Sequence, residues 1–227
     1  MAKSQTIVSL DPIDRRNKRD KGLIGRFLIT RYGKGKPIKK MLPFGHYMFC
    51  GSQGSGKTSS AIWYAEKLAL RYMKKKRPVK LYSNLGVGES FDKKKLFELI
   101  NNFEPDNKEI RIVIIDEIHT YFPRGSVDKE TAKLRDDLVA IFSQLRKRST
   151  FILSTAQVYG RLDKALREQC LYMINCKVSL NNKLINDFIW GDDVICDELG
   201  RWAGIPKFIY KHGLPKLAYD TKKIIRE

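Results

Sequence analysis

The chain has 227 residues, enough for one α/β domain with extensions, and its apolar content of 42% allows an ordinary hydrophobic core. Its 44 Lys and Arg residues against 25 Asp and Glu residues give a net charge of +19, which favours a polyanionic partner, either a nucleic acid or an acidic membrane surface. No signal-peptide region opens the chain and no apolar run approaches the roughly 18 residues of a membrane span, so we expect neither a secreted protein nor a transmembrane segment.

The first 40 residues are a distinct basic segment. They hold 12 Lys and Arg residues and 3 Asp and Glu residues, so they supply +9 of the net charge. Their short apolar stretch, residues 23–30, is suited to dock on the domain or on a neighbour, and a solvated disordered arm is the alternative. We predict a basic N-terminal arm over residues 1–40, a core domain over 41–185 and a C-terminal extension over 186–227.

A phosphate-binding loop is predicted at residues 51–58, which read GSQGSGKT and fit the pattern G-x-x-x-x-G-K-[ST]. The apolar run 47–50 before it is typical of a buried strand, and apolar residues at helical spacing follow over 61–72. The glycines let successive N–H groups turn toward phosphate oxygens at the positive end of the helix. We expect Lys57 to reach the β- and γ-phosphates of ATP and the Thr58 hydroxyl to bind Mg²⁺. The predicted nucleotide-binding residues are Gly51, Ser52, Gln53, Gly54, Ser55, Gly56, Lys57, Thr58 and Ser59.

Strands and helices then alternate. We predict a second strand at 79–84, a helix capped by Asp92 or Ser90, a third strand at 110–116, and a helix over about 128–145. A fourth strand at 151–155 and a fifth at 171–178 follow, and from Asp187 a small β-rich extension closes the chain. This order predicts a mostly parallel sheet covered by helices on both faces.

The third strand carries the second half of the expected site. Its apolar run ends in Asp116 and Glu117. At the carboxyl edge of a parallel sheet, Asp116 can hold the water shell of the Mg²⁺ bound by Thr58, and Glu117 can polarise a water for attack on the γ-phosphate. His119 is expected to have a polar or packing role. If the fourth strand lies between the two phosphate-site strands, Gln157 at its end lies near the γ-phosphate.

A family resemblance rests on the segment around the fourth strand. It comprises the basic run 145–149 (LRKRS), the strand, Gln157, Arg161, Asp163 and the run 168–170 (EQC). This order resembles the FtsK–HerA superfamily of DNA-pumping ATPases over about residues 45–180. The compact size and four further features are most similar to two groups: the genome-packaging ATPases of tailless, membrane-containing icosahedral viruses, and the zonula-occludens-toxin-like assembly ATPases of filamentous phages. The features are Ser83-Asn84, Asp116-Glu117, Tyr121-Phe122-Pro123-Arg124 and Tyr219-Asp220-Thr221.

The resemblance implies a RecA-like P-loop NTPase fold of the additional-strand catalytic-glutamate type. It also implies a hexameric ring in which a neighbour donates an arginine finger, with Arg146, Arg148 and Arg124 as the candidates and a solvated helix end as the alternative. The catalytic residues are then Lys57, Glu117, Gln157, Arg146 and Arg148, and the metal ligands are Thr58 and Asp116. The usual Arg-Pro after the glutamine is here Val158-Tyr159, so no role is carried over to those two positions.

The resemblance therefore implies a Mg²⁺-dependent ATPase that moves DNA into a preformed capsid, with capsid or capsid-membrane vertex proteins as partners, in the host cytoplasm or the virion. The filamentous-phage proteins usually carry a membrane span, whereas we expect none in this chain, and this difference favours packaging. The alternatives are a filamentous-phage-type or conjugative export ATPase, an ATP-switched assembly factor that does not grip DNA, and a small-molecule kinase. The four cysteines lack C-x-x-C and zinc spacing, so we expect free thiols in a reducing compartment.

Overall fold

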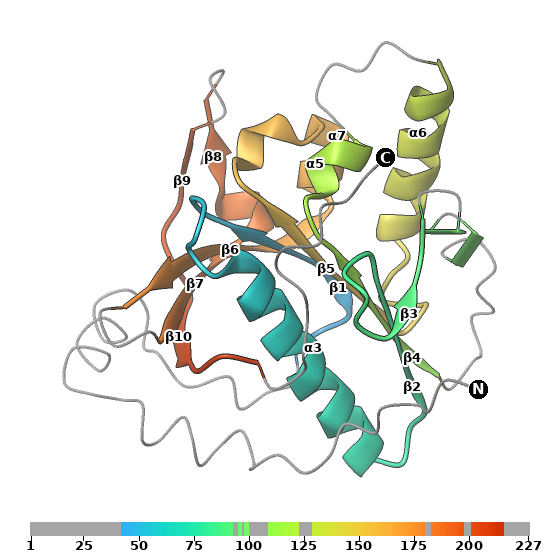
Figure 1. Cartoon of the computed structure of the whole chain (residues 1–227). Helices are drawn as coiled ribbons and strands as arrows, with labels where there is room; N and C mark the ends of the chain where they lie inside the picture. Colours follow the sequence, from blue (N-terminus) through green and yellow to red (C-terminus); the bar gives the residue numbers. More distant parts are fainter. Residues whose placement is uncertain are drawn as a thin grey trace.

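The computed structural model describes residues 42–92, 95–96, 98–99, 109–122, 129–179, 183–197 and 201–215 (Figure 1). Among them, eight strands form one sheet in the order β10-β7-β6-β1-β5-β4-β2-β3. These strands are β1 (Gly45–Cys50), β2 (Val79–Ser83), β3 (Glu89–Ser90), β4 (Ile110–Ile115), β5 (Thr150–Ala156), β6 (Cys170–Val178), β7 (Leu184–Trp190) and β10 (Phe208–His212).

The sheet is parallel from β3 to β6 and antiparallel beyond it. β1 pairs in parallel with both β5 and β6, and β5 pairs in parallel with β4. β7 then runs antiparallel to β6, and β10 runs antiparallel to β7. This is the α/β P-loop NTPase fold that the sequence predicts. The strand order confirms that an additional strand, β5, lies between the loop-bearing strand β1 and the carboxylate-bearing strand β4.

Helices cover both faces of the sheet (Figure 1). Helix α3 (Lys57–Lys74) lies on one face and contacts β1, β2, β4 and β5. The other face carries α5 (Ile118–Tyr121), α6 (Lys129–Phe142), the 3-10 turn η1 (Tyr159–Arg161) and α7 (Lys164–Glu168). Successive strand residues alternate between the two faces, so that Tyr47 and Phe49 join the α3 side of the core while Met48 and Cys50 join the other side.

Most predicted boundaries agree with the structure to within one or two residues. The helix predicted over 128–145 is an exception, because α6 ends at Phe142 and turns follow up to Ser149. Leu145 nevertheless remains buried in the core, which explains why the apolar pattern continues past the helix end. The expected cap at Asp92 is present, since the Lys95 N–H donates to Asp92 Oδ1 at 2.7 Å.

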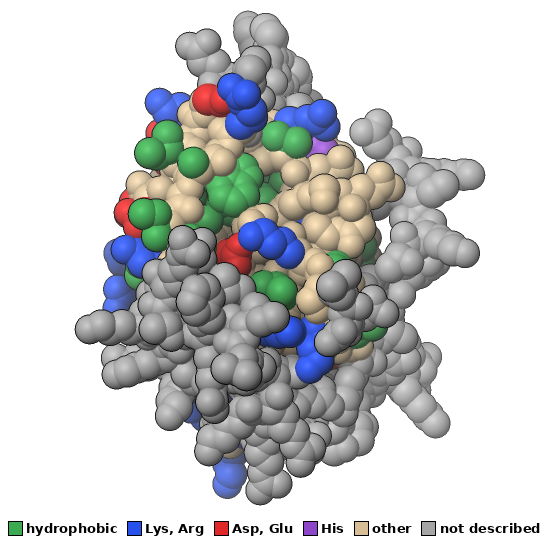
Figure 2. All heavy atoms as spheres, turned by 90° about the vertical axis from the view of Figure 1, so that its left-hand side faces the viewer, with side chains coloured by type: hydrophobic (Ala, Val, Ile, Leu, Met, Phe, Trp, Pro, Cys, Tyr) green, Lys and Arg blue, Asp and Glu red, His purple; other side chains and the backbone are tan. Residues whose placement is uncertain are grey.

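The C-terminal part adds strands to the main sheet and also forms a separate hairpin. β8 (Ile195–Cys196) and β9 (Trp202–Ala203) pair with each other after the 3-10 turn η2 (Gly191–Asp193). Figure 2 views the molecule from this side, where hydrophobic side chains are exposed among Lys and Arg side chains. The exposed large hydrophobic residues of this part are Val178, Ile195, Ile205 and Leu214.

Two further observations concern cysteines and membrane spans. All four cysteines are free thiols, and three of them are buried. Within the described ranges, no helix combines the length and apolarity needed to cross a bilayer. The arm over residues 1–40, Arg124 and residues 219–221 lie outside the described residues.

Candidate functional site

The predicted phosphate-binding loop connects the carboxyl end of β1 to the first turn of α3. Gly51 and Gly56 have φ values of 150° and 80°, in the region that favours glycine. Their lack of a side chain is also needed for packing: a Cβ on Gly51 would lie 2.8 Å from the Cys176 carbonyl oxygen, and one on Gly56 would overlap the Leu184 side chain. The loop therefore closes tightly against β6 and β7, as a phosphate cradle requires.

Lys57 points back into this loop. Its Nζ donates a hydrogen bond to the Ser52 carbonyl oxygen at 2.9 Å, and the residue is only 8% exposed. Ser52, Gln53 and Gly54 form the exposed rim, while Ser55 is buried below them. Helix α3 has no acidic residue of its own in its first turn, so its positive end faces the loop. An anion is thus favoured at this position.

A cluster of oxygen atoms lies at the start of α3. The Thr58 hydroxyl donates to Asp116 Oδ1 at 2.8 Å, and the Thr155 hydroxyl donates to the same oxygen at 2.7 Å. Burial raises the pKa of Asp116, and the two hydroxyl hydrogen bonds oppose that shift. A hydroxyl and a carboxylate this close are hard oxygen ligands of the kind that Mg²⁺ takes together with phosphate oxygens. The residues present therefore fit a magnesium ion held by Thr58 and Asp116.

The Asp116 backbone is fixed by a neighbouring strand. Asn84, the residue after β2, accepts a hydrogen bond from the Asp116 N–H at 2.8 Å and donates to the Asp116 carbonyl oxygen at 3.0 Å. Neither Asn84 nor Thr155 was assigned a role from the sequence. Each has a polar side chain at the carboxyl end of a strand that adjoins β4. This feature assigns a residue to the site only when the strand order is known.

Glu117 lies one residue further, at the start of α5. It adopts the left-handed conformation with φ 52°, and its N–H donates to Thr155 Oγ1 at 2.9 Å. Such a conformation costs a non-glycine residue about 1–3 kcal/mol and is typical of functional positions. Gln157 Nε2 donates to Glu117 Oε1 at 3.3 Å, and His119 Nε2 lies 3.8 Å from Glu117 Oε2. The carboxylate is therefore held at the same sheet edge as the loop, partly open to water.

The two described candidate arginines lie elsewhere in the subunit. Arg146 is exposed, and Arg148 donates to Gln144 Oε1 at 3.0 Å. Both precede β5, which runs parallel to β1, so they lie at the opposite edge of the sheet from the loop. The 7 residues of β5 separate the two edges by about 20 Å. The structure thus brings together Lys57, Thr58, Asp116, Glu117 and Gln157, and leaves Arg146 and Arg148 away from the subunit's own site.

Comparisons with solved structures gave several matches of low sequence identity. The N-terminal domain of zonular occludens toxin from Neisseria meningitidis has 19% identity and a TM-score of 0.49, with 77% of this chain and 96% of that chain covered. The genome packaging NTPase B204 from Sulfolobus turreted icosahedral virus 2 has 15% identity and a TM-score of 0.43 in its complex with ATP-gammaS, with 63% and 79% covered. A zonular occludens toxin domain and a viral genome packaging NTPase, which are the kinds of protein named from the sequence, are both among the matching structures.

Two sequence comparisons gave different outcomes. No curated protein matched the chain. A family model matched residues 47–178, which is more than half of the chain and spans the loop, the Asp116–Glu117 strand end and the β5 strand. The chain therefore belongs to the ATPase family associated with various cellular activities (AAA).

Proposed function

We propose that this protein is a Mg²⁺-dependent ATPase that moves DNA, and that its role is to package a viral genome into a preformed capsid. The observation that carries the proposal is the convergence of Lys57, the Thr58–Asp116 pair and the Glu117–Gln157 pair on one sheet edge. This arrangement contains a phosphate cradle, a metal-binding pair and a base, which are the parts that ATP hydrolysis needs.

Each of these residues has a distinct task in the proposed reaction. Glu117 accepts a proton from a water whose oxygen attacks the γ-phosphorus, and the bond from that phosphorus to the β–γ bridging oxygen breaks, which gives ADP and phosphate. Gln157 orients that water or the γ-phosphate, and the Lys57 ammonium stabilises the charge on the transferred group. When bound, Mg²⁺ neutralises charge on the β- and γ-phosphates.

The DNA part of the proposal rests on charge. The net charge is +19, and Lys74, Lys75 and Lys76 are exposed at the end of α3, opposite the helix end that faces the loop. This end of α3 is one surface suited to the phosphates of a nucleic acid. A ring of subunits would bring Arg146 or Arg148 of one copy toward the loop of the next, which is the arrangement in which these arginines would act.

Phosphate release with and without DNA tests the proposed function. We expect purified protein with Mg²⁺ and ATP to release phosphate without any acceptor molecule, and long duplex or single-stranded DNA to stimulate that release. The control is Lys57→Ala, which should remain folded and lose turnover. Release that DNA leaves unchanged would favour an ATP-switched assembly factor. Transfer of the γ-phosphoryl group to an acceptor molecule, which yields ADP and the phosphorylated acceptor without free phosphate, would favour a kinase.

The packaging role needs a separate test. Emptied capsids of the source virus, mixed with the protein, ATP and duplex DNA, should protect the DNA from nuclease, and the Lys57→Ala protein should give no protection. Stimulation by DNA without any protection would support a translocase that exports DNA or assembles another particle instead of filling a capsid.

A further inference from the structure

We propose that Asn186 is a positioning residue for the phosphate-binding loop, and that it acts by joining Ser60 in the first turn of α3 to His212 on β10. The inference rests on the proposed nucleotide site and extends it to the antiparallel strands at the C-terminal end of the chain. These strands contribute no predicted site residue, yet β7 packs directly against the loop.

The three side chains form a continuous hydrogen-bonded chain. The Ser60 hydroxyl donates to Asn186 Oδ1 at 3.1 Å, and Asn186 Nδ2 lies 2.8 Å from His212 Nε2. His212 Nδ1 lies 2.8 Å from the Gly213 carbonyl oxygen, which can only accept. Nδ1 therefore carries a proton, and Nε2 is left to accept from the Asn186 amide. The three contacts thus run in one direction, each from a donor to an acceptor.

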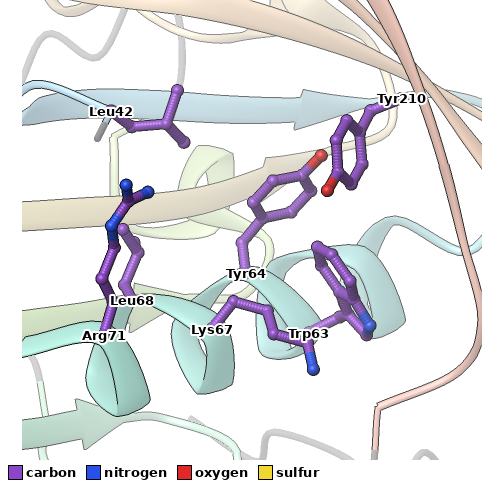
Figure 3. Close-up of a pocket in the computed structure, with 7 residues that line it drawn as sticks. All are labelled: Leu42, Trp63, Tyr64, Lys67, Leu68, Arg71 and Tyr210. Carbon is purple, nitrogen blue, oxygen red and sulfur yellow. The ribbon is translucent and has the colours of Figure 1, made fainter. Parts of the chain in front are cut away.

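This chain is removed from solvent. Ser60 and Asn186 are 0% exposed and His212 is 2% exposed. The Trp63 ring stacks on the His212 ring with centroids 4.1 Å apart, and the Tyr64 ring meets it edge-on at 5.6 Å. Figure 3 shows Trp63 and Tyr64 projecting from α3 toward Tyr210 of β10. Aromatic packing and buried hydrogen bonds together fix α3 against β7 and β10.

β7 and its neighbour β6 touch the two ends of the loop. Ser60 N–H donates to the carbonyl oxygen of Gly56, the last loop glycine, at 2.8 Å. The Leu184 side chain, two residues before Asn186, occupies the space where Gly56 would carry a Cβ. Gly51 closes in the same way against the Cys176 carbonyl oxygen of β6. A shift of β7 relative to α3 would therefore change the shape of the loop itself.

The physical reason for a functional effect is that a buried polar group without a partner is costly. Removing the Asn186 amide takes one acceptor from the Ser60 hydroxyl and one donor from His212 Nε2, and this loosens the hold of β7 and β10 on the first turn of α3. The loop N–H groups contact phosphate in the ground state and in the transition state alike. Loss of their alignment should therefore weaken nucleotide binding and raise KM, with little change in kcat.

The test measures nucleotide affinity in three variants of the full-length protein. Ser60→Ala removes one hydroxyl, Asn186→Leu replaces the amide by an apolar group of similar shape, and the third variant combines both. We expect each single variant to raise the Kd for Mg²⁺·ATPγS and the KM for ATP about fivefold, with kcat changed less than twofold. The double variant should bind no more weakly than Asn186→Leu alone, because both substitutions break the same chain.

Ser154→Ala is the matched control. Ser154 is also 0% exposed and its hydroxyl lies 2.6 Å from His46 Nε2, but this pair contributes to the core on the face opposite α3. We expect Ser154→Ala to lower the denaturation midpoint as Ser60→Ala does and to leave the Kd unchanged. Should Asn186→Leu fail to fold, the Kd values of Ser60→Ala and Ser154→Ala for Mg²⁺·ATPγS are sufficient to test the inference.

Two outcomes would overturn the inference in different ways. If the wild-type protein binds Mg²⁺·ATPγS and Ser60→Ala binds it within twofold as tightly, the hydrogen-bonded chain is structural only and the proposed function stands. If the wild-type protein does not bind the nucleotide at all, the proposed function fails and this inference fails with it.

Discussion

The buried carboxylate of Asp116 lowers the stability of the fold, although the proposed reaction needs it as a metal ligand. Burial raises its pKa above the ordinary carboxyl value of 3.8, so the folded protein holds that proton more tightly than the unfolded chain. The contribution of Asp116 to the free energy of unfolding without metal must therefore fall as the pH rises from 3.8 through the raised pKa and the carboxyl ionises. Thr58 and Thr155 donate to the carboxylate and offset only part of this cost.

Asp116→Asn should accordingly separate stability from activity. We expect the metal-free variant to be more stable than the wild type at pH 8, by up to about 1 kcal/mol, and by less at pH 5, because the buried charge is gone while the shape is retained. Mg²⁺-dependent ATP hydrolysis should fall about 100-fold or more. Urea unfolding at pH 5 and pH 8 with EDTA, beside phosphate release with Mg²⁺, measures both effects. A variant that is less stable at pH 8 and still active would contradict this account.

Glu117 should affect turnover and not affinity. In Glu117→Gln the amide keeps the side-chain shape and cannot accept the proton of the attacking water, so we expect kcat to fall about 10²–10⁴-fold while the Kd for ATP changes little. Single-turnover hydrolysis and equilibrium binding of ATP measure the two quantities. Wild-type turnover in this variant would show that the base is another residue.

Residue roles could be predicted from the sequence only where a local pattern carries them. Lys57, Thr58, Asp116 and Glu117 lie in short motifs, and the structure places them together. Thr155 and Asn84 hold Asp116 and Glu117 through contacts between residues 32 to 39 positions apart. No local spacing encodes such contacts, because they arise from the order of strands in the sheet.

At the scale of elements, the central parallel strands β1, β4 and β5 were predictable because they are buried on both faces and therefore read as largely apolar runs. β7 and β10 were not placed in the main sheet from the sequence. β7 carries Asn186 and Asp187 within its run, and these polar residues are buried by partners that only the fold supplies: His212 for Asn186, and Lys177, whose Nζ lies 2.7 Å from Asp187 Oδ2. Buried polar residues interrupt the apolar pattern from which a strand in the main sheet is predicted, so β7 was not predicted there.

The arginines in the turns between α6 and β5 lead to a prediction about catalysis between neighbouring subunits. Arg146 and Arg148 lie at the sheet edge opposite the loop of their own subunit, so either can act on ATP only in another copy. If one does, mixing an Arg146→Ala or Arg148→Ala chain with a Lys57→Ala chain should restore hydrolysis at the mixed interfaces, to a few tenths of the wild-type rate at most. Arg124→Ala belongs in the same series.

The mixing experiment needs two controls: the activity of each variant alone and evidence that mixed oligomers form. Each variant alone should be inactive, and native mass spectrometry should show that the two chains share rings. Mixed rings that remain inactive with all three arginine variants would count against a site shared between subunits.

At the scale of the whole molecule, the charge distribution predicts how DNA is held. Residues 1–40 carry +9 of the +19, and the exposed Lys74, Lys75 and Lys76 extend the basic surface on the core. No stretch of the sequence resembles a helix-turn-helix or a zinc finger that would contact base edges. A motor that moves a whole genome gains from binding phosphates, because every sequence presents them. Binding should therefore be non-specific and electrostatic.

Salt titrations of the full-length protein and of a chain lacking residues 1–40 test this expectation on two unrelated duplexes. The logarithm of the binding constant should fall linearly with the logarithm of salt concentration, with a slope of roughly −0.9 for each phosphate contacted. If the arm contacts DNA, its removal should make the slope shallower. The triple variant Lys74→Ala/Lys75→Ala/Lys76→Ala in the full-length chain measures how much of the slope comes from phosphate contacts made by the core domain. If the arm instead tethers the protein to a capsid or a membrane, its removal should leave the slope unchanged and abolish that attachment. A strong preference for one duplex, or binding that is indifferent to salt, would refute a non-specific motor, because phosphate contacts alone produce neither result.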